Sequence, residues 1–126
     1  MVITPSSPEF QPVREAVASA LTRSGIQPVW VDQFVSGEGI VQSLLGFISA
    51  ADFVVADLTG LNPNVLYEVG FAQGLRKRVL LIAQPSRFQF PSDLVGSLVF
   101  FYDLSSLAEL HQQLSTWVPR YFPAVA

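Results

Sequence analysis

The stretch from Phe53 to Gly70, FVVADLTGLNPNVLYEVG, decides the expected fold of this 126-residue chain. Its first residues, Phe53 to Ala56, are uniformly apolar, as in a strand that is buried on both faces of a sheet. Asn62 and Pro63 then mark a helix start, because Asn caps backbone amides and Pro suits the first helical position. A buried strand followed closely by a helix is typical of α/β proteins with parallel sheets.

The same alternation of apolar runs and amphipathic stretches extends along the whole chain. The pattern predicts strands at 2–4, 28–31, 53–57, 79–83 and 98–102. It predicts helices at 10–24, 40–51, 63–75 and 105–118, and Pro119 is expected to end the last helix. We therefore expect one α/β domain over residues 1–126, with a five-stranded, parallel, doubly wound (Rossmann-like) sheet in the flavodoxin-like order 2-1-3-4-5 and helices on both faces.

Composition narrows the classes of function. Half of the residues are hydrophobic, only 13% are charged and the net charge is −3, which argues against a nucleic-acid surface. The basic cluster from Arg76 to Arg78 falls at an expected helix C-terminus, where cations complement the helix dipole. The chain has no cysteine, no metal-ligand spacing and no run approaching the ~20 apolar residues of a membrane span. We expect a cytoplasmic domain without a metal. Whether this domain is part of a longer chain is left open by the sequence.

Ligands of parallel α/β sheets bind outside the carboxyl ends of the strands. The residues that follow the expected strands there are mostly hydroxyl, amide and carboxylate groups, and we expect them to bind substrate: Thr4, Pro5, Ser6, Ser7, Asp32, Asp57, Thr59, Gly60, Asn62 and Asn64. This rim is suited to sugar hydroxyls. A structural role is the alternative to a functional one for two of these residues. An Asp that ends a strand, such as Asp57, often binds loop amides, and an Asn before a helix, such as Asn62, is often a cap.

Glu68 is the principal candidate for chemistry. On a helical wheel of about 100° per residue it falls within the apolar arc of Val65, Val69 and Ala72, one turn after Asn64. A carboxylate on a face directed at the sheet needs a partner or a function. From position alone, a catalytic role and a satisfied structural carboxylate are equally open. His111, at the edge of the last helix's apolar face, is expected to be structural.

These residues carry a resemblance to a known family. Residues 51–60, ADFVVADLTG, and 62–72, NPNVLYEVGFA, resemble the core motif of the nucleoside 2-deoxyribosyltransferase-like family, which shares its fold and catalytic glutamate with TIR-type NAD-cleaving domains. Residues 2–10, VITPSSPEF, are similar to that family's first strand and loop. The resemblance implies that Glu68 attacks the anomeric carbon of the sugar or assists departure of nicotinamide. It further implies that Asp57 orients the sugar or the glutamate, and that residues 4–7 line the ribose or phosphate pocket.

The chain departs from the transferases in one respect. They carry a further acidic residue shortly before the glutamate to handle the base, whereas this chain has Asn62 and Asn64 there. A neutral nucleobase needs a proton in order to leave. Nicotinamide is cationic in NAD and leaves as a neutral molecule, so it needs none. The absence of the second acidic residue therefore favours NAD slightly over a neutral nucleoside.

The resulting hypothesis is an enzyme, an N-glycosidase or transferase, that acts on a nucleoside or nucleotide such as NAD or a deoxynucleoside. It would need no cofactor, with NAD a possible substrate, and would form homo-oligomers as related enzymes do. The alternative is a non-catalytic module of a signalling or defence system that senses a nucleotide or assembles as TIR-type domains do.

Overall fold

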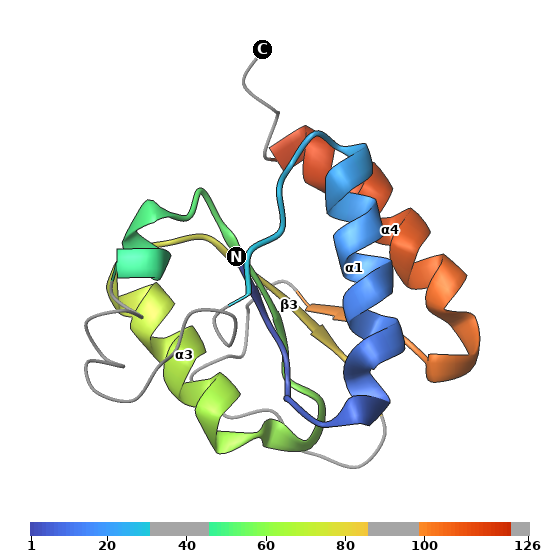
Figure 1. The fold of residues 1–126 in the computed structure, drawn as a ribbon, viewed down its shortest axis with the longest axis horizontal. Coiled ribbons are helices and arrows are strands. Elements are labelled where there is room, and N and C mark those ends of the chain that lie inside the picture. Colours follow the sequence, from blue (N-terminus) through green and yellow to red (C-terminus); the bar gives the residue numbers. More distant parts are fainter. Residues whose placement is uncertain (31–45, 86–98, 122–126) are drawn as a thin grey trace.

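The computed structural model describes residues 1–30, 46–85 and 99–121 of the chain (Figure 1). The described strands form one parallel sheet in the order β1-β2-β3-β4: β1 (Val2–Ile3), β2 (Val54–Asp57), β3 (Val79–Ala83) and β4 (Val99–Phe101). Three longer helices are described in full: α1 (Gln11–Arg23), α3 (Pro63–Gly74) and α4 (Leu107–Tyr121). Residues 46–50 are also helical, and 3-10 turns span Pro8–Phe10, Thr59–Leu61 and Leu104–Ser106.

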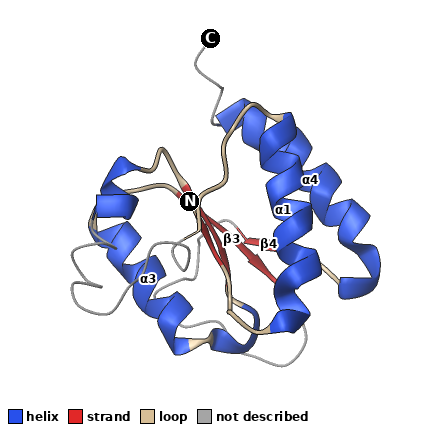
Figure 2. Ribbon diagram, viewed as in Figure 1, coloured by secondary structure: helices blue, strands red, loops and turns tan. Residues whose placement is uncertain are grey.

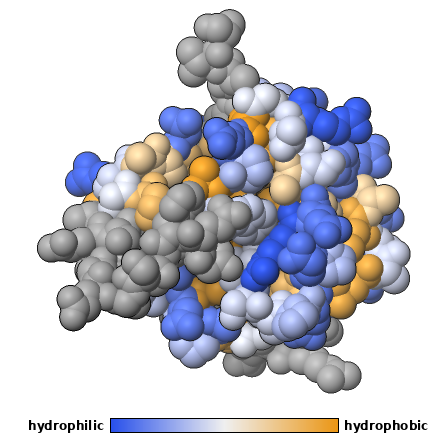
Figure 3. All heavy atoms as spheres, viewed as in Figure 1, coloured by the Kyte–Doolittle hydropathy of each residue, from blue (hydrophilic) through white to orange (hydrophobic). Residues whose placement is uncertain are grey.

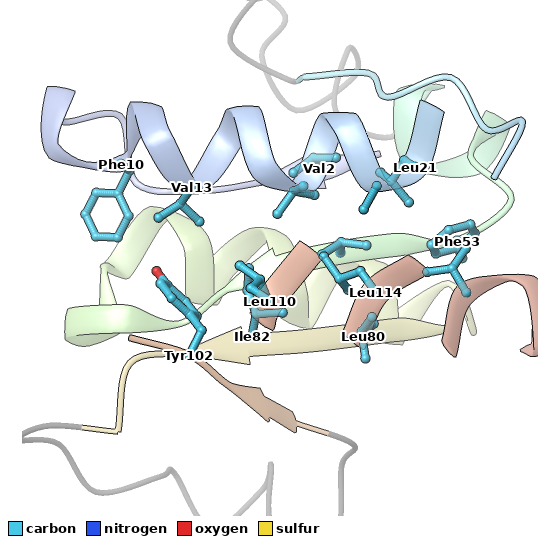
Figure 4. Close-up of a cluster of buried hydrophobic side chains, with 14 residues drawn as sticks. Val2, Phe10, Val13, Leu21, Phe53, Leu80, Ile82, Tyr102, Leu110 and Leu114 are labelled. Atoms are coloured by element: carbon cyan, nitrogen blue, oxygen red, sulfur yellow. The ribbon is translucent and has the colours of Figure 1, made fainter. Parts of the chain in front are cut away.

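Helices cover both faces of the sheet, as the apolar strands predict (Figure 2). Successive side chains of a strand point to opposite faces. In β2, Val54 and Ala56 pack in a cluster with residues of α3, whereas Val55 packs in the cluster that includes residues of α1 and α4. Figure 4 shows this second cluster between the α1 and α4 helices and the sheet. The expected α/β architecture with a parallel, two-sided sheet is therefore confirmed.

The apolar faces of the helices agree with the sequence pattern. Along α1 and α4, apolar residues at helical spacing are completely or almost completely buried: Val13, Val17, Ala20, Leu21, Leu110 and Leu114. The outward side of α1 is hydrophilic (Figure 3). α1 ends as expected before Gly25, whose φ of 78° lies in the left-handed region that glycine adopts at little cost.

The expected five-stranded sheet is not found in the described residues. Of the segment 28–31, Trp30 forms a single parallel bridge to Val2, and Val31 lies outside the described residues. The Val2 amide donates to the Val29 carbonyl at 2.8 Å, but Pro28 has no N–H with which to extend a ladder. In the described part of this segment, Trp30 adjoins β1 through one bridge, and the order 2-1-3-4-5 is not established. The first part of the helix expected at 40–51 also lies outside the described residues.

The prediction that Pro119 ends the last helix is wrong. α4 continues through Pro119 to Tyr121. A proline removes the backbone hydrogen bond from its own nitrogen and crowds the carbonyl four residues earlier. Here that loss falls in the final turn, where few further hydrogen bonds depend on it, and Pro119 itself is exposed to solvent.

Candidate functional site

The turn between β2 and α3 has the structure that its sequence predicts. Gly60 has a φ of 75°, and Leu61 follows with a φ of 49°, so the chain reverses direction through the left-handed region. The side-chain oxygen of Asn62 accepts hydrogen bonds from the amides of Asn64 at 2.9 Å and Val65 at 3.3 Å. Pro63 occupies the first turn of α3. Asn62 is therefore the N-cap of α3, the structural role that its place before a helix indicates.

Glu68 lies at the edge of the α3 face that covers the sheet. Val65, Val69 and Ala72 are buried on that face, and Glu68 beside them is half-buried. Tyr67, the preceding residue, is 55% exposed, which shows how sharply burial changes around this turn. Asn64, one turn earlier, is exposed. Glu68 thus lies between the buried and the exposed sides of α3, in the second turn of that helix.

Asp57 is completely buried at the carboxyl end of β2. Its Oδ1 atom accepts a hydrogen bond from the Thr59 amide at 2.9 Å, and its Oδ2 atom accepts one from the Tyr102 hydroxyl at 2.5 Å. Tyr102 packs in the cluster between the sheet and α1 and α4 (Figure 4), so Asp57 points to the face opposite α3. Both carboxylate oxygens therefore have protein partners on the far side of the sheet from Glu68.

Two further hydrogen bonds join this pair to β3. The Gln84 amide donates to Thr59 Oγ1 at 2.9 Å, and the Gln84 side-chain nitrogen donates to the Tyr102 hydroxyl oxygen at 3.3 Å. The four side chains, which we call the Asp57 network, are Asp57, Thr59, Gln84 and Tyr102. They tie together the carboxyl ends of β2, β3 and β4 and hold the turn that leads to α3.

Burial dominates the electrostatics of the Asp57 network. Loss of solvent raises the pKa of Asp57 above its ordinary value, and the hydrogen bonds from Tyr102 and Thr59 oppose that rise. Burial and the adjacent Asp57 charge raise the pKa of Tyr102 far above its ordinary value. Tyr102 therefore stays a neutral phenol that keeps its proton and donates a hydrogen bond to the carboxylate.

The loop after β1 is held by a cation that the sequence analysis did not single out. Arg14 of α1 donates from Nε to Thr4 Oγ1 at 2.8 Å and from Nη2 to the Pro5 carbonyl at 2.7 Å. Ser6 and Ser7 are exposed beyond this clamp, and Ser7 Oγ donates to Glu9 at 3.4 Å. The spacing of ten residues between Thr4 and Arg14 carries no sequence signal.

The predicted binding residues thus fall into separate groups at one edge of the sheet. β1 and β2 pair in parallel, so the Thr4–Ser7 loop and the Asp57–Asn64 turn follow neighbouring strand ends. Asp57 and Thr59 belong to the internal network, Asn62 is a cap, and Asn64, Gly60, Ser6 and Ser7 are exposed. Asp32 lies outside the described residues.

Tyr102 is the member of this region that sequence reasoning missed. It ends the strand expected at 98–102, so its position at the same edge was foreseeable. Its ring nevertheless reads as one more apolar residue of a buried strand. The distinguishing signal was a polar atom at the carboxyl end of one strand of a parallel sheet in which another strand, two positions away, ends in Asp.

Other polar groups have structural roles. His111 lies between Ser19 of α1 at 3.2 Å and Ser115 at 3.5 Å, which agrees with the structural role expected of it. Lys77 donates to the carbonyls of Ser49 and Ala51, both at 2.9 Å, at the end of the helical segment 46–50.

Among the described residues, no group of acidic, histidine or cysteine side chains is arranged to hold a metal ion. No described helix is long and apolar enough to cross a membrane.

Comparison with solved structures finds a similar fold in the CMP N-glycosidase BcmB of Clostridium botulinum. The TM-score is 0.65 and the sequence identity 17%, over 93% of this chain and 99% of that chain. No protein-family model and no curated relative matches the sequence. At this identity the likeness establishes a shared architecture along almost the whole length of both chains.

Proposed function

We propose that this protein cleaves or transfers the N-glycosidic bond of a nucleoside or nucleotide, with Glu68 as the carboxylate that acts on the sugar. The observation that carries the proposal is the half-buried place of Glu68 in the second turn of α3, beyond the carboxyl end of β2. The fold supports it, since a protein of the same architecture is an N-glycosidase of CMP.

The reaction asks little of the protein beyond a well-placed negative charge. As the bond between the anomeric carbon and the base nitrogen breaks, its electron pair leaves with the base and positive charge develops on the sugar. Glu68 either bonds to that carbon or stabilises the charge electrostatically, which is strongest where water is excluded. Water or an acceptor base then takes the sugar and frees Glu68.

Asp57 acts in this proposal as a positioning residue. The resemblance implies that it orients the sugar or the glutamate, and its bonds to Thr59 and Tyr102 favour an indirect role. By fixing the amide of Thr59, it holds the turn from which α3 and Glu68 follow. Thr4, Ser6, Ser7, Gly60, Asn62 and Asn64 are proposed to line the sugar and phosphate side of the pocket, together with Asp32.

The leaving group separates two substrate classes. Cytosine needs a proton as it leaves, whereas nicotinamide leaves NAD without one. A similar fold in a CMP N-glycosidase favours a pyrimidine nucleotide. Asn62 and Asn64 favour NAD, because an amide cannot supply the proton that a neutral base needs.

We also propose the five-stranded order 2-1-3-4-5 for the sheet, which the parallel bridge between Trp30 and Val2 supports.

The test is Glu68→Gln, which removes the charge and keeps the size of the side chain. Purified parent and variant are incubated with CMP, dCMP, deoxynucleosides and NAD, and released bases are quantified by chromatography and mass spectrometry. We expect turnover to fall by about 10²–10³-fold or more, the loss typical when a group that stabilises transition-state charge is removed. Glu15→Gln, on the exposed side of α1, is the matched control and should turn over like the parent.

Two outcomes would contradict the proposal. Equal turnover by the parent and Glu68→Gln would remove Glu68 from the chemistry. Tight binding of a nucleotide by the parent, measured by calorimetry and unaccompanied by any product after long incubation, would favour the sensing module instead.

A further inference from the structure

A groove of about 500 Å³ runs between the edge strand β4 and the outer side of α4. One strand residue, Phe100, contributes to it, and the remaining lining residues come from α4: Glu109, Gln112, Gln113, Thr116, Trp117 and Arg120. The α4 helix packs its inner face on the sheet and contacts α1 through the bond between His111 and Ser19. The groove therefore occupies the side of α4 that neither the sheet nor α1 covers.

The floor of the groove is aromatic. The rings of Phe100 and Trp117 meet edge to face, with centroids 5.7 Å apart and an interplanar angle of 89°. Both residues are half-buried, while the other five lining residues are exposed. An aromatic centre with a polar rim is the usual anatomy of a protein–protein contact.

The lining residues of α4 are arranged symmetrically along the helix. About a midpoint between Leu114 and Ser115, Glu109 mirrors Arg120, Gln112 mirrors Trp117, and Gln113 mirrors Thr116. In an antiparallel pair of identical helices, such mirrored positions lie opposite each other. Glu109 and Arg120 are eleven residues apart, or ~16 Å along the helix axis. An acidic group at one end and a basic group at the other make the stripe complementary to itself.

We propose that this groove binds the same groove of a second copy of the chain, with the two α4 helices antiparallel around a two-fold axis. Each Glu109 then faces Arg120 of the second copy, so that both ends of the contact carry opposite charges, as an isologous interface requires. The antiparallel arrangement also brings opposite helix dipoles side by side. Charges separated by about three helical turns suit a long helical occupant better than a compact ligand that would reach only one of them.

This interface is independent of the proposed chemistry. Glu68 belongs to α3 on one face of the sheet, and the groove belongs to α4, which packs on the other. Dimer formation and turnover can therefore be measured separately, and failure of either proposal leaves the other intact.

The test is a charge reversal and its swap, followed by sedimentation equilibrium over a wide range of protein concentration. Glu109→Lys places Lys beside Arg120 of the second copy at both ends, so we expect the dimer dissociation constant to rise by roughly tenfold or more. The double variant Glu109→Lys, Arg120→Glu restores opposite charges and should recover most of that loss. Glu15→Lys, the same charge change on the exposed side of α1, should leave association unchanged.

The swap also excludes a trivial explanation. Lys near the start of α4 and Glu near its end both oppose the helix dipole, so the double variant has a less favourable helix than the parent. Recovery of the dimer therefore cannot arise from a more stable helix. A chain that stays monomeric at several hundred micromolar, a Glu109→Lys variant as dimeric as the parent, or a swap that fails to recover association would each overturn the proposal. A groove that binds only a small molecule while the chain stays monomeric would do the same.

Discussion

Removing the Tyr102 hydroxyl tests how the buried Asp57 carboxylate is held. Tyr102→Phe keeps the ring in the core and deletes the donor to Oδ2, and it also deletes the acceptor for the Gln84 side chain. A hydrogen bond to a charged group is worth about 1.5–3 kcal/mol, and a buried charge that loses its partner gains no solvent in exchange. We therefore expect a loss of about 2–3 kcal/mol of unfolding free energy at pH 7.

The loss should depend on pH, and its sign follows from the pKa of Asp57. Burial raises that pKa in the folded protein, so the unfolded chain releases its proton first as pH increases. Stability conferred by this group then falls as pH rises from the unfolded pKa to the folded pKa, and is constant above it. The Tyr102 hydrogen bond lowers the folded pKa, so Tyr102→Phe raises it further. The variant should therefore lose stability over a wider pH range than the parent, and differ from it least in acid.

Urea unfolding followed by circular dichroism between pH 4 and 8 measures both effects. Tyr67→Phe is a matched control, because the same hydroxyl is deleted from a side chain that is 55% exposed. We expect the control to stay within about 0.5 kcal/mol of the parent at every pH. A Tyr102→Phe loss below about 0.5 kcal/mol, or one that is the same in acid and at neutral pH, would refute the charge-based account of the Asp57 network.

Two further predictions concern the ends of α3, and urea unfolding checks both. Asn62→Ala removes the oxygen that caps two amides and should cost about 1 kcal/mol, whereas the neighbouring Asn64→Ala, which exchanges an exposed residue for a better helix former, should cost nothing. An equal loss in both variants would contradict the capping role. Arg76 has a φ of 59° just beyond the helix, so Arg76→Gly should raise stability by up to about 1 kcal/mol, whereas Gln73→Gly inside the helix should lower it by about 1 kcal/mol. Destabilisation by Arg76→Gly would show that its left-handed conformation carries no strain.

The elements near the centre of the chain were predictable because their signals are local. β3 spans the predicted Val79–Ala83, and α3 begins at the predicted Pro63 under the Asn62 cap. Continuous apolar runs and helix periodicity act within a few residues, so the strands and the helices α1 and α4 could be located from the sequence. The continuation of α4 through Pro119 was predicted incorrectly, because the cost of a proline depends on its place in the helix and here falls in the final turn. The strand expected at 28–31 is described only as a single parallel bridge from Trp30 to Val2, and it stays a prediction.

The amino-acid pattern alone determined the class of fold, the start of α3 and the position of Glu68 next to the apolar face of that helix. Only the tertiary structure decided which groups meet: Tyr102 with Asp57 across 45 positions, and the Arg14 guanidinium with the loop after β1. The reason is physical. Hydrophobic periodicity and capping are properties of consecutive residues, whereas a buried carboxylate takes whichever donor the packed sheet brings within hydrogen-bonding distance.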